Sequence, residues 1–168
     1  MREILFRGKA ANRQEGRPYR TTYKNGDWVF GLLTDPLNYA GFAEMTNTNR
    51  VQGIEVDSNT VGQFTGFYDS TKWEDLTPEE QQTFLNQPDG WKNTPDLWHG
   101  QPIFDGDILE FANKDGSVAR YEVKWGDVMG AWLAKWTEGA GGINIGIACE
   151  LMVVVGNIHD NPELLEVK

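Results

Sequence analysis

Two segments rich in glycine and aromatic residues limit what this chain can fold into. They are residues 62–69 (GQFTGFYD) and residues 100–111 (GQPIFDGDILEF). Glycine accepts the positive φ angles of tight turns, and the apolar residues between the glycines can enter short strands. The spacing therefore predicts strand, tight turn and strand, which indicates a small β-domain. We assign structural turn roles to Gly62, Gly66, Gly106, Asp107 and Gly156.

Length and composition fit one β-rich domain, or one domain with an elaboration. The chain has 168 residues, and 12% of them are aromatic, including seven tryptophans. Each buried ring removes a large apolar area from water, so these side chains can fill a core where aliphatic residues are scarce. The 19 glycines and seven prolines favour many turns and few long helices.

The sequence predicts a soluble, cytoplasmic protein. Charged residues interrupt the apolar run within residues 1–7, so we expect no signal peptide. No stretch approaches the ~20 apolar residues that cross a bilayer, so we expect no membrane partner. The lone cysteine, Cys149, excludes a framework of intrachain disulfides.

The net charge of −10 is unevenly distributed along the chain. Residues 1–50 hold eight Lys/Arg against five Asp/Glu, whereas residues 51–168 hold seven against twenty. An acidic surface repels the phosphate backbone. Direct binding of nucleic acid by the larger part of the chain is therefore disfavoured.

Alternating apolar residues predict strands in the N-terminal half. We expect a first strand containing Ile4 and Phe6, a hairpin over 19–33 around the Asn25-Gly26 turn signal, a loop over 34–50, and paired strands over 51–56 and 61–68. These short strands, linked by turns, favour antiparallel sheets.

The C-terminal half has the clearest alternation in the chain. We expect strands over 107–111, 118–125, 130–136, 143–147 and 151–158, and a closing helical turn over 161–165. Ala119, Tyr121, Val123 and Trp125 should share the buried face of their strand, while the residues between them face solvent. The apolar run 152–155 predicts a central, buried strand.

Residues 70–98 differ in character and are interpreted as a partly helical insertion between two strands. Thr77, Pro78 and Glu80 form the pattern of a helix start. The threonine side chain can accept from a backbone amide of the first turn, proline suits the first helical position, and the glutamate side chain can accept from the threonine amide. The helix should end near Asn86 or before Pro88. The insertion either covers an apolar face or forms a lid that binds a partner. The candidate partner-binding residues are Trp73, Phe84, Trp91 and Trp98.

Side chains that could carry chemistry are few, and we assign no catalytic residue, cofactor site or metal site. His99 and His159 are interpreted as solvated or capping side chains, and Cys149 as buried filler, because no oriented partner is evident for any of them. The carboxylates of Asp105, Asp107 and Glu110 could hold Ca²⁺ or Mg²⁺ loosely, but they fit turn capping better.

Four segments, in order, resemble the YopX family of phage and prophage proteins. They are residues 1–7 (MREILFR), 62–66 (GQFTG), 102–108 (PIFDGDI) and 155–165 (VGNIHDNPELL). The resemblance implies a mainly β fold whose C-terminal residues 99–168 form an SH3-like barrel, with an N-terminal β region over 1–69 packed on it. The insertion over 70–98 departs from the family's usual short link. The family has no established activity, so the resemblance implies no catalytic residue.

Three hypotheses for function follow from these observations. The first is a non-enzymatic, phage- or prophage-derived interaction or self-assembly module in the cytoplasm of a bacterial host, whose partner is a protein or a second copy of itself. The second is an acidic decoy that occupies the DNA-binding surface of a host protein, suggested by the charge of residues 51–168. The third is a metal-assisted hydrolase that uses Asp105, Asp107 or Glu110.

Overall fold

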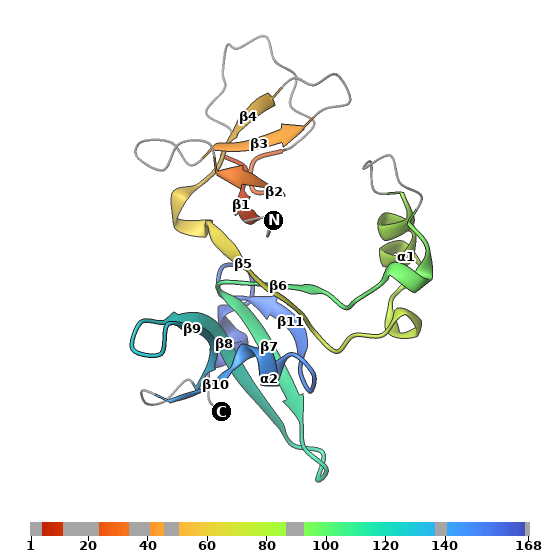
Figure 1. Ribbon diagram of the computed structural model, residues 1–168, viewed down its shortest axis with the longest axis vertical. Coiled ribbons are helices and arrows are strands. Elements are labelled where there is room, and N and C mark those ends of the chain that lie inside the picture. Colours follow the sequence, from red (N-terminus) through yellow and green to blue (C-terminus); the bar gives the residue numbers. More distant parts are fainter. Residues whose placement is uncertain are drawn as a thin grey trace. The chain divides into compact units, whose positions relative to one another are not determined.

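The computed structural model describes residues 5–11, 24–33, 41–45, 51–86, 93–136 and 141–166. The chain is mainly β, with two antiparallel sheets and few helices, which confirms the fold class predicted from the sequence (Figure 1). It divides into two compact units, residues 1–64 and residues 65–168. No helix in the described ranges is long and apolar enough to cross a membrane.

In its described residues, the first unit contains four strands and the beginning of a fifth. These are β1 (Phe6–Lys9), β2 (Trp28–Leu33), β3 (Gly41–Met45), β4 (Val51–Glu55) and β5 (Gly62–Tyr68), in the spatial order β4-β3-β2-β1-β5. A short 3₁₀ turn, Ser58–Thr60, precedes β5. Ala10, Val29 and Val56 form a small buried cluster, with Phe6 and Val61 packed against it.

Two predictions for the N-terminal half are wrong, and a third is tested only in part. Residues 34–50 were predicted to form a loop, but β3 occupies 41–45 and pairs with β4. Strands β4 and β5 do not form the predicted pair, because β5 takes β1 as its neighbour. The Asn-Gly turn exists, with Gly26 at φ +89°, but it leads into β2, which pairs with β1. The predicted first arm of that hairpin, 19–23, and Ile4 lie outside the described residues.

The second unit is built on a five-stranded antiparallel sheet with the order β10-β9-β8-β7-β11. Its strands are β7 (Asp107–Ala112), β8 (Val118–Gly126), β9 (Ala131–Lys135), β10 (Gly142–Asn144) and β11 (Val153–Asn157). The end of β5 neighbours the short strand β6 (Pro102–Phe104). The described strands form open sheets, and the barrel remains a prediction.

One apolar cluster supports this sheet. Its buried members are Ile103, Leu109, Val123, Ala134, Ile145, Ala148 and Met152. The predicted alternation on β8 is confirmed at Val123, which is fully buried, and at Tyr121, which packs against the cluster. It fails at Trp125, whose side chain is 45% exposed, because β8 continues beyond the apolar cluster.

Two predicted strands in the C-terminal half are corrected. Strand β10 ends at Asn144, whose Oδ1 accepts from the Gly146 amide (2.9 Å) and starts the short helix α2 (Ile145–Ala148). The run 152–155 is not a central strand, since β11 lies at one end of the sheet order and pairs with β7 through a bulge between Val154 and Gly156. The predicted helical turn is present as a 3₁₀ helix, Pro162–Leu165.

The predicted helix start is confirmed by helix α1 (Pro78–Leu85). The Thr77 hydroxyl accepts from the Glu80 amide (3.3 Å), and Glu80 Oε2 accepts from the Thr77 amide (2.8 Å). This reciprocal pair satisfies two amides that the first turn leaves without helical partners. The helix ends at Leu85 with Asn86 as its C-cap, and two 3₁₀ turns flank it, Trp73–Asp75 and Pro95–Leu97.

Candidate interaction surfaces

Three of the four aromatic residues predicted to bind a partner come together in space. Trp73, Phe84 and Trp98 form a ring cluster with edge-to-face geometry. The ring centroids are 5.8 Å apart for Trp73 and Phe84, 6.2 Å for Trp73 and Trp98, and 5.2 Å for Phe84 and Trp98. This arrangement places the positive edge of one ring on the negative face of another. Trp91 lies outside the described residues.

Hydrogen bonds to backbone carbonyls fix the ring cluster. Trp98 Nε1 donates to the Thr71 carbonyl (2.9 Å), and Gln81 Nε2 donates to the Trp73 carbonyl (3.0 Å). Asn93 Nδ2 donates to the Phe84 carbonyl (2.8 Å). All three rings are half-buried and contact one another. Their packing is that of a small local core.

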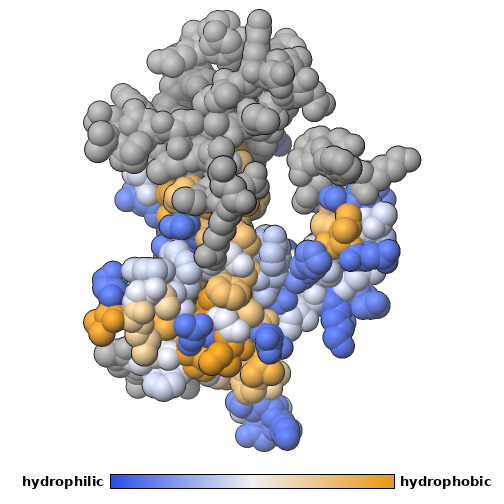
Figure 2. All heavy atoms as spheres, viewed as in Figure 1, coloured by the Kyte–Doolittle hydropathy of each residue, from blue (hydrophilic) through white to orange (hydrophobic). Residues whose placement is uncertain are grey.

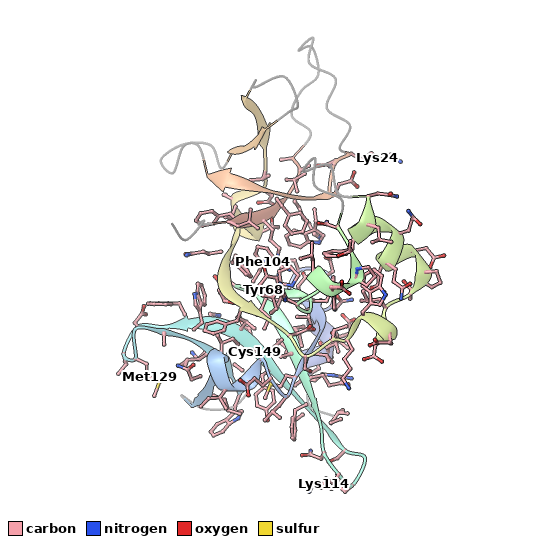
Figure 3. All side chains as sticks on the ribbon, turned by 45° about the vertical axis from the view of Figure 1, so that its right-hand side comes forward. Lys24, Tyr68, Phe104, Lys114, Met129 and Cys149 are labelled. Atoms are coloured by element: carbon pink, nitrogen blue, oxygen red, sulfur yellow. The ribbon has the colours of Figure 1, made fainter. Side chains whose placement is uncertain are left out.

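A second apolar feature lies at the turn between β8 and β9, and we call it the hairpin tip: Trp125, Val128 and Met129. Val128 is fully exposed and Met129 is 68% exposed. Trp125 packs edge-to-face on Trp132, with ring centroids 5.3 Å apart. Figure 3 shows Met129 at the end of the hairpin. Apolar side chains thus extend from the sheet core to a solvent-exposed turn.

Backbone hydrogen bonds hold the turn that carries the tip. The amides of Met129 and Gly130 both donate to the Gly126 carbonyl (3.0 and 2.8 Å), and Gly130 has φ +58°. This surface is not among those predicted from the sequence. A signal was present, because Val128 and Met129 stand between two glycines where turns usually carry polar residues.

Other exposed apolar side chains lie near α2. Ile147 and Leu151 are both exposed, four residues apart. Figure 2 shows apolar residues on the surface of the part of the chain that carries the five-stranded sheet. Cys149, between them, is half-buried against the core cluster. Burial, together with the nearby carboxylate of Glu150, raises the pKa of the Cys149 thiol, so the thiolate is disfavoured.

The predicted turn residues occupy three different settings. Gly62 is a strand residue of β5 opposite Arg7, and Gly66 lies within β5 at φ +88°. Gly106 lies in the turn between β6 and β7 at φ +79°. The buried Asp107 follows it, and its Oδ2 accepts from the Phe104 amide (2.7 Å) across that turn.

The C-terminal motif is organised around Asn157. Its Oδ1 accepts from the amides of His159 and Asp160, both at 3.0 Å. A Cβ at Gly156 would lie 2.5 Å from Asn161 Oδ1, so a side chain there would displace the Asn161 amide. The Ile158 amide donates to the Gly106 carbonyl (2.9 Å), which joins this motif to the β6–β7 turn. The C-terminal motif and the β6–β7 turn therefore both contribute hydrogen bonds that stabilise the fold.

The carboxylates considered for metal binding are separated by their contacts. Asp107 caps its turn, and Glu110 Oε2 lies 2.9 Å from Arg120 Nε. The hydrogen bond from Lys124 to Glu122, aided by the charges of Glu122 and Asp105, raises the pKa of Lys124. Across the described ranges, no group of three His, Cys, Asp or Glu side chains is placed to hold a metal ion.

The structure thus defines a mainly β protein with a partly helical insertion that contains the ring cluster, and with an apolar hairpin tip. A family model described as YopX protein matches residues 77–166, from the beginning of α1 to the C-terminal motif. Because this match covers more than half of the chain, the chain belongs to the YopX family. The resemblance found in the sequence is confirmed. A search of curated proteins found no match.

Proposed function

We propose that this YopX family member is a non-enzymatic interaction module whose contact surface is the hairpin tip. One observation carries the proposal: Val128 is fully exposed beside Met129 and a partly exposed Trp125. Apolar surface in contact with water is unfavourable, so a partner that covers these side chains gains binding free energy. Tryptophan and methionine are also enriched in protein interfaces.

The partner is a protein or a second copy of this chain. A protein surface can bury the tip's apolar side chains, whereas the phosphate backbone of a nucleic acid is repelled by a chain of net charge −10. Of the three carboxylates that the hydrolase hypothesis names, Asp105, Asp107 and Glu110, the last two are engaged in a turn and an ion pair, which favours a non-enzymatic role.

We also propose an origin and a cellular location for the protein, and a barrel fold for its C-terminal part. The family resemblance and the lone Cys149 support a phage- or prophage-derived protein that acts in the cytoplasm of a bacterial host. A five-stranded antiparallel sheet, in which turns join β7 to β8 and β8 to β9, supports an SH3-like barrel over residues 99–168, separated along the sequence from a β region over 1–69 by the insertion over 70–98.

The test compares two pairs of exposed apolar side chains. In the tip variant, Val128→Ser and Met129→Ser are combined, and in the control, Ile147→Ser and Leu151→Ser. Each protein is used for affinity capture from bacterial lysate and for sedimentation velocity at several concentrations. The wild type should capture a protein or self-associate, the tip variant should lose that binding at least about tenfold, and the control should keep it. Equal binding by wild type and tip variant, or no binding by the wild type, would refute the proposal.

A second function has one observation in its favour, the exposed carboxylates of the insertion. Glu74, Asp75, Glu79, Glu80 and Asp96 are all exposed. If the protein is an acidic decoy for a DNA-binding protein, the captured partner should be released by competing duplex DNA and by salt. Binding that survives both treatments, but depends on the tip, would select the interaction module.

A further inference from the structure

The insertion leaves the sheet region at the end of β5 and returns at the beginning of β6, and we call its described residues, 70–86 and 93–98, the arm. Figure 1 shows the two stems that lead to α1 and back. The arm has its own apolar interior in the ring cluster of Trp73, Phe84 and Trp98. In the described part of the chain, the main core cluster draws its members from outside the arm. The arm thus has the internal contacts of a separate folding element.

One buried carboxylate joins both stems of the arm. Asp69 Oδ1 accepts from the amides of Thr71 (3.0 Å) and Gln101 (2.7 Å), one on each stem. Asp69 Oδ2 accepts from the Thr71 hydroxyl (2.8 Å) and from the amide of Val154 (2.8 Å), which lies on β11. A single side chain, only 5% exposed, therefore links the arm, the approach to β6 and the edge of the five-stranded sheet.

The backbone of Asp69 and both donors of Ser70 make further hydrogen bonds to residues beside β6 and β11. The Asp69 amide donates to the Gln101 carbonyl (2.9 Å). The amide and hydroxyl of Ser70 both donate to the Met152 carbonyl (3.0 and 2.9 Å). Gly100 has φ +103°, and a Cβ there would lie 2.1 Å from the Asp69 carbonyl oxygen. The stems can approach this closely only because Gly100 has no side chain.

We call the hydrogen bonds that Asp69 and Ser70 make to the stems, to β11 and to the Met152 carbonyl the joint. The joint is polar, whereas the interior of the arm is apolar. Water can replace the hydrogen bonds of a polar joint, so its opening exposes little apolar surface and costs little beyond those bonds. Opening the ring cluster, in contrast, would expose aromatic surface. We propose that Asp69 is a latch: its carboxylate fixes the arm to β6 and β11, and its release lets the arm move as an intact folded body.

The test is amide exchange and relaxation by NMR on the full chain, comparing wild type, Asp69→Ala and the control Asp75→Ala. The control removes an exposed carboxylate of the same arm. In Asp69→Ala, the amides of Thr71, Gln101 and Val154 should exchange about tenfold to a hundredfold faster. The indole proton of Trp98 should keep its wild-type shift, and the order parameters of the α1 amides should fall together. The control should change none of these.

Two results would overturn the latch. One is unchanged exchange at all three amides in Asp69→Ala, since the carboxylate would then hold nothing. The other is loss of the Trp98 indole signal together with the α1 amides, since the arm would then unfold with the joint. If Asp69→Ala does not fold, the same readouts on Asp69→Asn and on Thr71→Val, which removes one of the four donors, decide between these outcomes.

Discussion

The ring cluster and the hairpin tip are both rich in aromatic and apolar residues, yet their environments are opposite. In the ring cluster, Trp98 contacts two other rings and donates its indole proton to a carbonyl. At the tip, Trp125 has one ring neighbour among the described residues, and Val128 in the same turn is fully exposed. The difference teaches that a tryptophan-rich segment is not by itself a binding surface, because its rings can satisfy one another.

The largest expected effect comes from adding one methyl group, at Gly100 beside Asp69 or at Gly130 in the turn of the hairpin tip. Gly100→Ala should destabilise the protein by about 3 kcal/mol or more, because the added Cβ meets the Asp69 backbone and the φ angle of +103° strains alanine. Gly130→Ala at the tip should cost only about 1 kcal/mol, since its φ is +58° and no atom lies within 4 Å of the new Cβ. Urea unfolding of both variants measures the difference. Equal losses would mean that the joint is no more constrained than the tip.

The next effect compares two tryptophans. Trp98→Ala should reduce the local stability of α1 by about 2–3 kcal/mol, because it removes two ring contacts and leaves the Thr71 carbonyl without its donor. Trp125→Ala should cost about 1 kcal/mol at its own hairpin, since it loses one ring contact. Hydrogen exchange of the amides of α1 and β8 reports each region. A larger loss of stability in Trp125→Ala than in Trp98→Ala would show that the tip, and not the arm, is the packed site.

A smaller effect tests the beginning of the arm's helix. Thr77→Ala should destabilise α1 by about 1 kcal/mol, because it removes the hydroxyl that accepts from the Glu80 amide. Thr83→Ala provides the control, since Thr83 is an exposed threonine of the same helix whose hydroxyl donates to the Glu79 carbonyl (2.8 Å). Exchange rates of the first-turn amides should rise in Thr77→Ala alone. A similar rise in both variants would contradict a specific role of the cap.

Features that depend on neighbouring residues were predictable from the sequence. The helix start at Thr77 and the closing turn at Pro162 follow from capping and proline chemistry within a few residues. The strand around Val123 follows from period-two alternation. In each case the physics that fixes the element lies inside the element itself.

Features that depend on distant residues were not predictable. Strand β3 forms because it pairs with β4, although its flanks have a loop-like composition. The alternation of Ile143, Ile145 and Ile147 favours a strand, but residues 145–148 form α2, which buries Ile145 and Ala148 in the core cluster with residues distant in sequence. For the candidate site, the sequence selected the residues of the ring cluster but could not show that Trp73 and Trp98 face each other.

The smallest effect on stability belongs to the tip. Combining Val128→Ser with Met129→Ser should change the free energy of unfolding by no more than about 0.5 kcal/mol, because both side chains lie mainly in water. If the tip is a contact surface, the same variant loses partner binding, so stability and binding separate. Urea unfolding measured beside the sedimentation and capture experiments checks this. A loss of stability above about 1 kcal/mol would instead show that these side chains pack within the fold, as those of the ring cluster do.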